Sequence, residues 1–219
     1  MNKNDKFFIR KFSHELRNPL TAVSSSLQLL ERSNPSVKDS KYWNAISDDI
    51  AYMIALLDDF TSFSSTGLRR TSFSLETLLK QVALSFAASM TDKEIHFSSR
   101  IHLEGNLFIG DFVKLQEVLR NLLKNAADAC KAGDTIHLDA TSNSDKVCIL
   151  VRDSGCGIAK EYLPTIFEPF VTYKRHGNGL GLPICKQIVE AHHGTITIES
   201  RASSGTLVRI ELPANEQGK

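Results

Sequence analysis

Apolar side chains recur at steps of three and four residues through the first 64 residues of the chain, which limits this segment to helical structure. This spacing places side chains on one face of an α-helix. The sequence therefore predicts two helices, over residues 5–32 and 39–64, separated by a break at residues 33–36. The two stripes consist of Ile9, Phe12, Leu16, Leu20, Val23, Leu27 and Leu30, and of Trp43, Ile46, Ile50, Met53, Leu57 and Phe60.

A single hairpin of these two helices would bury only part of its apolar surface, because Tyr42, Ile54 and Leu56 widen the second stripe. Two hairpins paired as a four-helix bundle would cover the rest. We therefore predict that residues 1–66 form a homodimer. A hairpin packed on the second domain of its own chain is the alternative. Pro19 interrupts the first stripe and predicts a kink there.

The pattern changes at Ser72, where short strand-like runs begin to appear between helical ones. Because helices and antiparallel strands are segregated rather than strictly alternating, the predicted class of this half is α+β. We expect a linker at 67–72, a second domain at 73–213 and a tail at 214–219. Helices are predicted at 75–86, at 112–131 after an Asp111 cap and from the glycine-rich stretch to 193, and strands at 95–97, 107–109, 135–140, 146–152, 195–200 and 206–212.

Composition excludes several classes of protein. The net charge is +1 with acidic and basic residues interspersed, so a nucleic-acid partner is not indicated. No apolar run approaches the roughly 20 residues of a membrane-spanning helix, so we expect no membrane contact by this segment. The four cysteines show no metal-binding or disulfide-like spacing, and we expect buried thiols in a reducing compartment.

A first chemical motif lies in the first helix. His14 falls off the apolar stripe, Glu15 is adjacent, and Asn18 is one helical turn away. A neutral imidazole is a competent nucleophile near pH 7, and a neighbouring carboxylate can accept its proton. Taken alone, these residues favour an ordinary surface histidine with a helical neighbour over a catalytic one.

Three later motifs indicate a phosphate-bearing ligand. Asn121 and Asn125 share one helical face, and an amide oxygen suits Mg²⁺ that bridges phosphates. The run Asp153-Ser-Gly-Cys-Gly-Ile follows a strand, and its glycines allow close backbone approach. Residues 177–182 carry three glycines into a helix N-terminus, which attracts anions. Each motif is weak alone, since amides can cap helices and glycines can form turns.

In this order the motifs resemble those of sensor histidine kinases of two-component systems. Residues 12–20 resemble the H-box, 116–129 the N-box, 153–158 the G1 box, 166–170 the F-box and 177–182 the G2 box, and Gly205-Thr206 resembles the last glycine motif. The resemblance covers residues 7–213. It implies a dimeric phosphoacceptor hairpin followed by the ATP-binding α/β sandwich that gyrase, Hsp90, histidine kinases and MutL-type proteins share.

The resemblance also implies a role for each matched residue. His14 would accept the γ-phosphoryl group of ATP, Glu15 would assist as a base, and Asn18 would serve in dephosphorylating the partner response regulator. An aspartate on that regulator's receiver domain would receive the phosphoryl group. The cofactors would be ATP and Mg²⁺, the metal held by Asn125, and the ATP-binding residues would be Asn121, Asn125, Asp153, Gly155, Gly157, Ile158, Lys174, Arg175, Gly177, Gly179, Leu180, Gly181, Leu182 and Thr206.

Two departures bear on this interpretation. Asp128 stands where many family members carry a basic residue that contacts phosphate, so Lys174 and Arg175 are expected to supply that charge. Asn121 stands where related hydrolytic ATPases carry glutamate, which favours transfer over hydrolysis. A gyrase- or MutL-like ATPase and a degenerate, non-catalytic scaffold remain as alternatives. We expect a cytoplasmic location, either as such or as the cytoplasmic part of a longer membrane-bound sensor.

Overall fold

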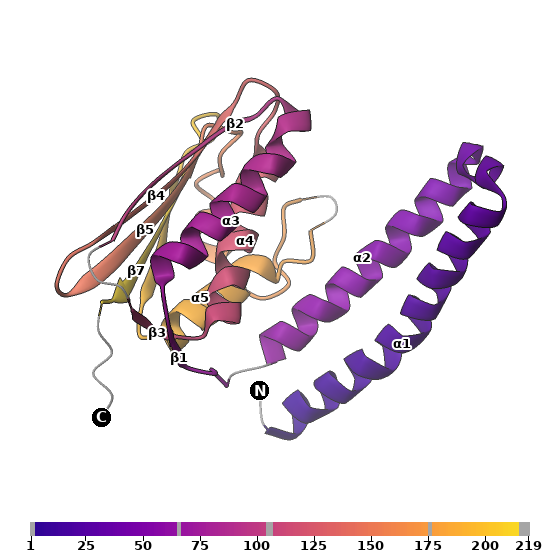
Figure 1. Cartoon of the computed structure of the whole chain (residues 1–219), viewed down its shortest axis with the longest axis horizontal. Helices are drawn as coiled ribbons and strands as arrows, with labels where there is room; N and C mark the ends of the chain where they lie inside the picture. Colours follow the sequence, from indigo (N-terminus) through magenta and orange to yellow (C-terminus); the bar gives the residue numbers. More distant parts are fainter. Residues whose placement is uncertain (1–2, 65–66, 104–106, 175–176, 215–219) are drawn as a thin grey trace. The chain divides into compact units, whose positions relative to one another are not determined.

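The computed structural model describes residues 3–64, 67–103, 107–174 and 177–214, without the side chains of residues 3–11, 14 and 64. The chain divides into two compact units, Met1–Ser65 and Thr66–Lys219. The first is a helical hairpin in which α1 (Lys3–Ser33) and α2 (Lys41–Ser64) pack against each other (Figure 1). The short 3₁₀ helix η1 (Pro35–Asp39) joins them, as the predicted break requires. Helix α1 continues through Pro19.

The hairpin covers only some of its predicted stripes. Trp43 and Ile50 of α2 are buried. In contrast, Phe12 is 50% exposed, Val23 46% and Ile46 47%, and these side chains belong to the same stripes. Leu16, Leu30 and Met53 are also exposed. A single hairpin therefore leaves an apolar face uncovered, which is the surface that a second hairpin would bury.

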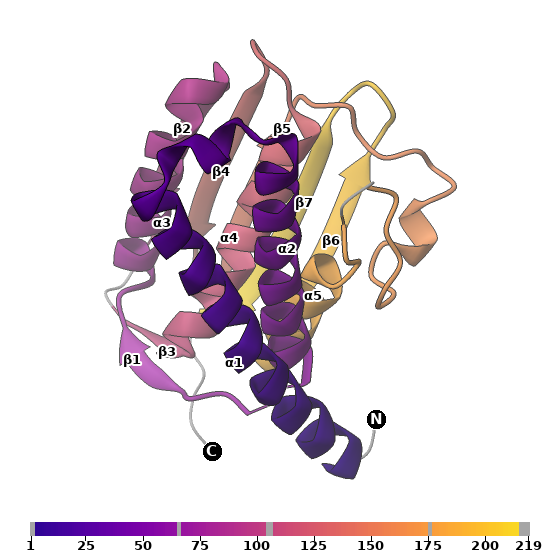
Figure 2. The ribbon, with the colours of Figure 1, turned by 90° about the vertical axis from the view of Figure 1, so that its right-hand side faces the viewer.

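The second unit is a two-layer sandwich of helices on one face of a mixed sheet (Figures 1 and 2). Buried apolar residues alternate along the central strands and meet the apolar faces of the helices, which forms the core. The sheet order is β2 (His96–His102), β4 (Thr135–Ser142), β5 (Lys146–Asp153), β7 (Thr206–Pro213) and β6 (Thr195–Ser200). The covering helices are α3 (Leu75–Met90), α4 (Phe112–Ala129) and α5 (Gly181–Ala191), and 3₁₀ turns occur at η2 (Thr91–Lys93) and η3 (Leu163–Thr165).

Two features of the strands in this unit differ from the sequence-based expectation. Strand β2 pairs with β4 in parallel, whereas antiparallel strands were expected. The chain between them crosses over through β3 (Phe108–Gly110) and α4, which is long enough to return a strand in the same direction. Strand β1 (Thr71–Phe73) was not predicted, and it pairs antiparallel with β3 in a separate two-stranded sheet.

A buried histidine joins the two helices that carry the candidate site. His192, the residue after α5, is 1% exposed. Its Nε2 accepts a hydrogen bond from the backbone N–H of Asp111 at 2.9 Å, and its Nδ1 lies 2.8 Å from the carbonyl oxygen of Ile188. A neutral ring with its proton on Nδ1 satisfies both contacts. Asp111 in turn caps α4 by accepting from the backbone N–H of Lys114 at 3.1 Å, as predicted.

No helix in the described part of the chain has an apolar stretch that could cross a lipid bilayer. The four cysteines are free thiols, but only Cys185 is buried. Cys130 and Cys148 are half-buried, and Cys156 is exposed. The expectation of four buried thiols is therefore wrong for Cys156, because this residue lies in the turn after β5 rather than within a core element.

Replacement of His192 tests the contacts by which this residue joins α4 and α5, which we call the His192 junction. His192→Ala leaves the Asp111 N–H and the Ile188 carbonyl without their buried partner and opens a cavity. We expect the free energy of unfolding to fall by at least about 2 kcal/mol in urea denaturation. His102→Ala, which removes an exposed histidine of β2, should change it by less than about 0.5 kcal/mol. Equal values for the two variants would contradict a structural role for His192.

Candidate functional site

Helix α4 presents two asparagines beside its buried apolar face. Asn121 and Asn125 are half-buried and four residues apart, so they lie on the same side of the helix. The side-chain nitrogen of Asn121 is buried and has no hydrogen-bond partner in the described structure. An unpaired buried donor is unfavourable by about 1–3 kcal/mol, which makes this amide a candidate for a ligand contact.

The loop after β5 begins with a buried carboxylate. Asp153 is 8% exposed, and its Oδ1 accepts a hydrogen bond from the backbone N–H of Gly155 at 2.9 Å. Burial raises the pKa of Asp153 above its usual range, although the backbone N–H groups of Gly155 and Thr206 oppose this shift. The nearby Asp134 adds to the rise and Lys174 lowers it. The site therefore holds an acceptor in a poorly solvated position.

At two positions of this loop, the neighbouring backbone lies so close that only glycine fits. A Cβ atom on Gly155 would lie 2.4 Å from the carbonyl oxygen of Ala129 at the end of α4. Gly157 has φ +66°, and a Cβ there would lie 2.1 Å from the carbonyl oxygen of Arg201. Between them, the N–H of Cys156 donates to the Ala129 carbonyl at 3.0 Å. The loop is therefore clamped between α4 and the β6–β7 turn.

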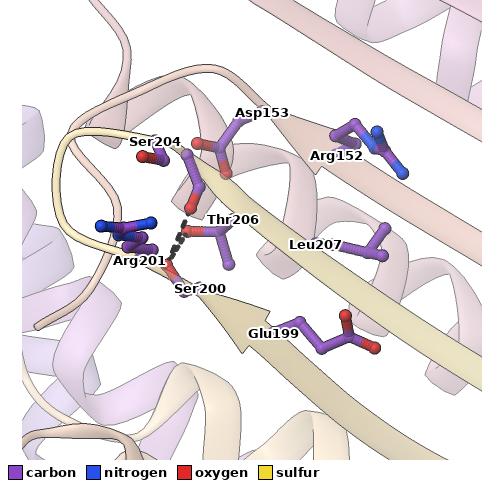
Figure 3. Close-up of a pocket in the computed structure, with 9 residues that line it drawn as sticks. Arg152, Asp153, Glu199, Ser200, Arg201, Ser204, Thr206 and Leu207 are labelled. Atoms are coloured by element: carbon purple, nitrogen blue, oxygen red, sulfur yellow. Dashed lines mark hydrogen bonds between the residues drawn. The ribbon is translucent and has the colours of Figure 1, made fainter. Parts of the chain in front are cut away.

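Ser200 connects this loop to the last glycine motif. Its Oγ accepts from the backbone N–H of Ile158 at 2.8 Å. It also donates to the Gly205 carbonyl at 2.9 Å and lies 2.9 Å from Thr206 Oγ1 (Figure 3). Ser200 belongs to no motif that the sequence analysis identified. A hollow of about 380 Å³ opens at this end of the sheet, and Arg152, Asp153, Glu199, Ser200, Arg201, Ser204, Gly205, Thr206 and Leu207 line it. It contains Asp153 and Thr206 but neither α4 asparagine.

The glycine-rich stretch brings the start of α5 beside α4, and the two helices pack against each other. A Cβ on Gly181, the first residue of α5, would lie 4.0 Å from the side-chain nitrogen of Asn125. Gly179 has φ +66° and accepts from the Phe170 N–H at 3.0 Å. Leu180 is buried, whereas Gly177 and Leu182 are half-buried. The stretch therefore places a helix N-terminus next to the predicted metal ligand.

Lys174 is a cation from outside α4 that contacts Asn125 and Asp128 of this helix. Its Nζ donates to Asn125 Oδ1 and to Asp128 Oδ2, both at 3.1 Å. Its neighbour Tyr173 stacks on Tyr162 at 3.7 Å between ring centroids. Arg175, the second predicted phosphate contact, lies outside the described residues.

Asn125 provides a side-chain oxygen of the kind that the predicted Mg²⁺ site requires. Asn125 Oδ1 already accepts from a cationic group, so its lone pair is accessible to positive charge. Among the described residues, no three His, Cys, Asp or Glu side chains gather as a metal cage. A single amide ligand together with nucleotide phosphates is the kind of site that Mg²⁺ occupies in nucleotide-binding enzymes.

The phosphoacceptor motif lies in the other unit. Glu15 and Asn18 are exposed on α1, and the intervening Arg17 forms an ion pair with Asp58 of α2. This pair joins the two helices within one turn of His14. The imidazole of His14 lies outside the described side chains, so its predicted exposure stays a prediction.

Two family models match the chain. The model of the His Kinase A (phospho-acceptor) domain matches residues 5–68, and that of the histidine kinase-, DNA gyrase B- and HSP90-like ATPase matches residues 110–216. Each match contains the corresponding motif: His14 lies in the first, and the asparagines of α4, Asp153 and the glycine-rich stretch lie in the second.

Individual relatives agree with this division. Sporulation kinase C of Bacillus subtilis (strain 168) is 31% identical over 203 residues, which are 92% of this chain and 47% of the relative. The chain spans about half or less of the curated relatives it matches. The structure of full-length ShkA in complex with AMPPNP is similar over 96% of this chain and 46% of ShkA, with a TM-score of 0.80 and 25% identity.

The histidine kinase ThkA provides two further comparisons. Its catalytic domain is 31% identical, with a TM-score of 0.59 over 67% of this chain and 96% of that domain. ThkA in complex with the response regulator protein TrrA is 27% identical, with a TM-score of 0.69 over 95% of this chain and 61% of ThkA. With both family models in the expected order and the motifs in place, the chain belongs to the sensor histidine kinases of two-component systems.

Proposed function

We propose that this chain binds Mg·ATP at α4, the loop after β5 and the glycine-rich stretch, phosphorylates itself on His14 and passes the phosphoryl group to an aspartate of a response regulator. The observation that supports this most is the clamped loop, because it brings Asp153 to Thr206 and to the end of α4 at one end of the sheet. The ShkA complex with AMPPNP and the ThkA complex with TrrA support the nucleotide and the partner, respectively.

Each proposed residue has a specific task in the transfer. A ring nitrogen of His14 attacks the γ-phosphorus, the bond from that phosphorus to the β,γ-bridging oxygen breaks, and ADP leaves. Glu15 accepts the proton that the ring nitrogen gives up. Asp153 accepts from the adenine amino group, and Asn125 holds Mg²⁺, which neutralises phosphate charge when bound. Catalysis then rests on placement and charge neutralisation.

Asn121 distinguishes this function from that of a gyrase- or MutL-like ATPase. An amide cannot accept a proton from water, so Asn121 cannot activate water for hydrolysis. Its unpaired, buried nitrogen instead offers a donor to the nucleotide. We therefore favour transfer to histidine over ATP hydrolysis.

The hairpin supports a homodimer as the working form. Its uncovered apolar face, which includes Phe12, Val23 and Ile46, matches what a four-helix bundle would bury. We place the reaction in the cytoplasm, where ATP and receiver domains are available.

Labelling with γ-³²P-ATP tests the phosphoacceptor. Wild-type chain should acquire label that is stable to alkali and lost in acid, as expected of a phosphohistidine. His14→Gln should remove at least about 99% of it while nucleotide affinity stays within about twofold, because His14 is the nucleophile and lies in the other unit. Undiminished label in His14→Gln would contradict the assignment.

Asn18 should separate two activities. Asn18→Ala is expected to leave self-phosphorylation within about threefold and to slow dephosphorylation of a phosphorylated response regulator at least tenfold, by about 1.4 kcal/mol of activation free energy. The measurement is loss of label from the purified regulator with ADP present. A parallel loss of both activities would show that Asn18 is needed for the hairpin rather than for the phosphatase step.

Gly155 tests the clamped loop. Gly155→Ala forces the loop away from the Ala129 carbonyl, so we expect binding of a non-hydrolysable ATP analogue to weaken at least tenfold in calorimetry. Gly67→Ala is the matched control, because a Cβ at Gly67 meets nothing within 4 Å. Wild-type affinity in Gly155→Ala would mean that the close approach does not shape the nucleotide site.

A further inference from the structure

The nucleotide-facing side of α4 carries an unexpected negative charge. Asp128 follows Asn125 by three residues and is therefore its neighbour on the helix surface. Nucleotide phosphates at Asn125 would lie close to this carboxylate and would be repelled by it. A site that binds phosphates here needs a cation that outweighs Asp128.

Lys174 is in place to supply that cation. Its ammonium lies 3.1 Å from Asp128 Oδ2 and 3.1 Å from Asn125 Oδ1, so one group bridges the carboxylate and the proposed metal ligand. The side chains of Lys174 and Asp128 are 46% and 39% exposed, which leaves the ammonium accessible to a ligand. Burial raises the pKa of Asp153 at the start of the loop after β5, and the positive charge of Lys174 opposes this rise.

The backbone around Lys174 is held on both sides. The Lys174 N–H donates to Thr172 Oγ1 at 3.2 Å, and the Lys174 carbonyl accepts from the Gly177 N–H at 3.2 Å. Tyr173 is fixed by its stacking on Tyr162 and by a 2.8 Å hydrogen bond between its hydroxyl and Thr165 Oγ1. The direction of the long Lys174 side chain therefore depends mainly on what its ammonium contacts.

We propose that Asp128 is a positioning residue that holds the Lys174 ammonium beside Asn125, where it faces the phosphates of the bound nucleotide. The inference rests on the proposed function, since it places those phosphates at Asn125. When a metal takes Asn125 Oδ1, the ammonium keeps Asp128 as one acceptor and has N–H donors available for a phosphate oxygen. The carboxylate thereby provides, through Lys174, the positive charge that α4 itself lacks at this position.

If Asp128 instead held Lys174 away from the phosphates, its removal would change nucleotide affinity in the opposite direction. If Asp128 merely withdrew Lys174 from the phosphates, its removal would free the lysine and tighten nucleotide binding. If it positions the lysine, its removal weakens binding, and only for ligands that carry phosphates.

Calorimetry on the full chain with Mg·AMPPNP and with adenosine tests this. We expect Lys174→Met to weaken AMPPNP binding about tenfold and Asp128→Asn about threefold, the range for a partly exposed ion pair. The double variant should bind no more weakly than Lys174→Met alone, because the two residues act as one unit. Adenosine affinity should stay unchanged in every variant.

Two further variants test the pair, one that exchanges the charges of Asp128 and Lys174 and one that removes a lysine of a distant ion pair. Asp128→Lys combined with Lys174→Asp should recover most of the AMPPNP affinity, since an ammonium again lies at α4. Lys146→Met is the matched control, because Lys146 is 49% exposed and pairs with Glu211 at 2.7 Å at the far end of β5 from Asp153. It should bind both ligands like the wild type.

Wild-type or tighter AMPPNP binding by Asp128→Asn would overturn the inference while leaving the proposed function intact. So would a parallel loss of adenosine binding, which would indicate a general structural effect. Failure of the wild-type chain to bind AMPPNP would overturn the proposed function and this inference together.

Discussion

The second unit, residues 66–219, depends on a close approach of three backbone segments that leaves no room for a side chain. The loop after β5 touches the carbonyl of Ala129 on one side and that of Arg201 on the other, and Gly155 and Gly157 are the residues that permit it. Gly205 completes the arrangement, because a Cβ there would lie 2.0 Å from the Asp153 carbonyl oxygen. The loop that carries Asp153 is thus placed by main-chain contacts, which keeps its geometry well defined.

Two polar groups at this place have an unfavourable free energy in the protein alone, and a bound ligand can improve it. Asp153 is buried with a raised pKa, and the amide nitrogen of Asn121 is buried without a partner. Both are unfavourable in the protein alone and favourable once a complementary donor or acceptor arrives. The His192 junction and the Asp111 cap offset these terms by fixing α4 and α5, the helices that carry the site.

Much of this structure follows from local sequence signals. The amphipathic periods of α1, α2 and α4, the Asp111 cap and the short strand-like runs at β4 and β5 predicted those elements, because each signal acts within a few residues. Strand β1 was missed because three residues carry no period, and the parallel pairing of β2 with β4 was missed because pairing is not encoded locally. The bridge from Lys174 to Asp128 spans 46 residues, so only the fold reveals it. The same holds for Ser200, because it lies in no recognisable motif and its partner Ile158 is 42 residues away in the sequence.

In the proposed site, segments that are distant in sequence bind one nucleotide together. Hydrogen exchange of the full chain, with and without Mg·AMPPNP, measures this most directly. Exchange should slow together at residues 121–129, 153–158, 177–182 and 200–206, and should be unchanged in β2, which lies at the far edge of the sheet from β6. Slowing confined to one of these segments, or spread evenly over both units, would contradict a nucleotide site assembled at the clamped loop.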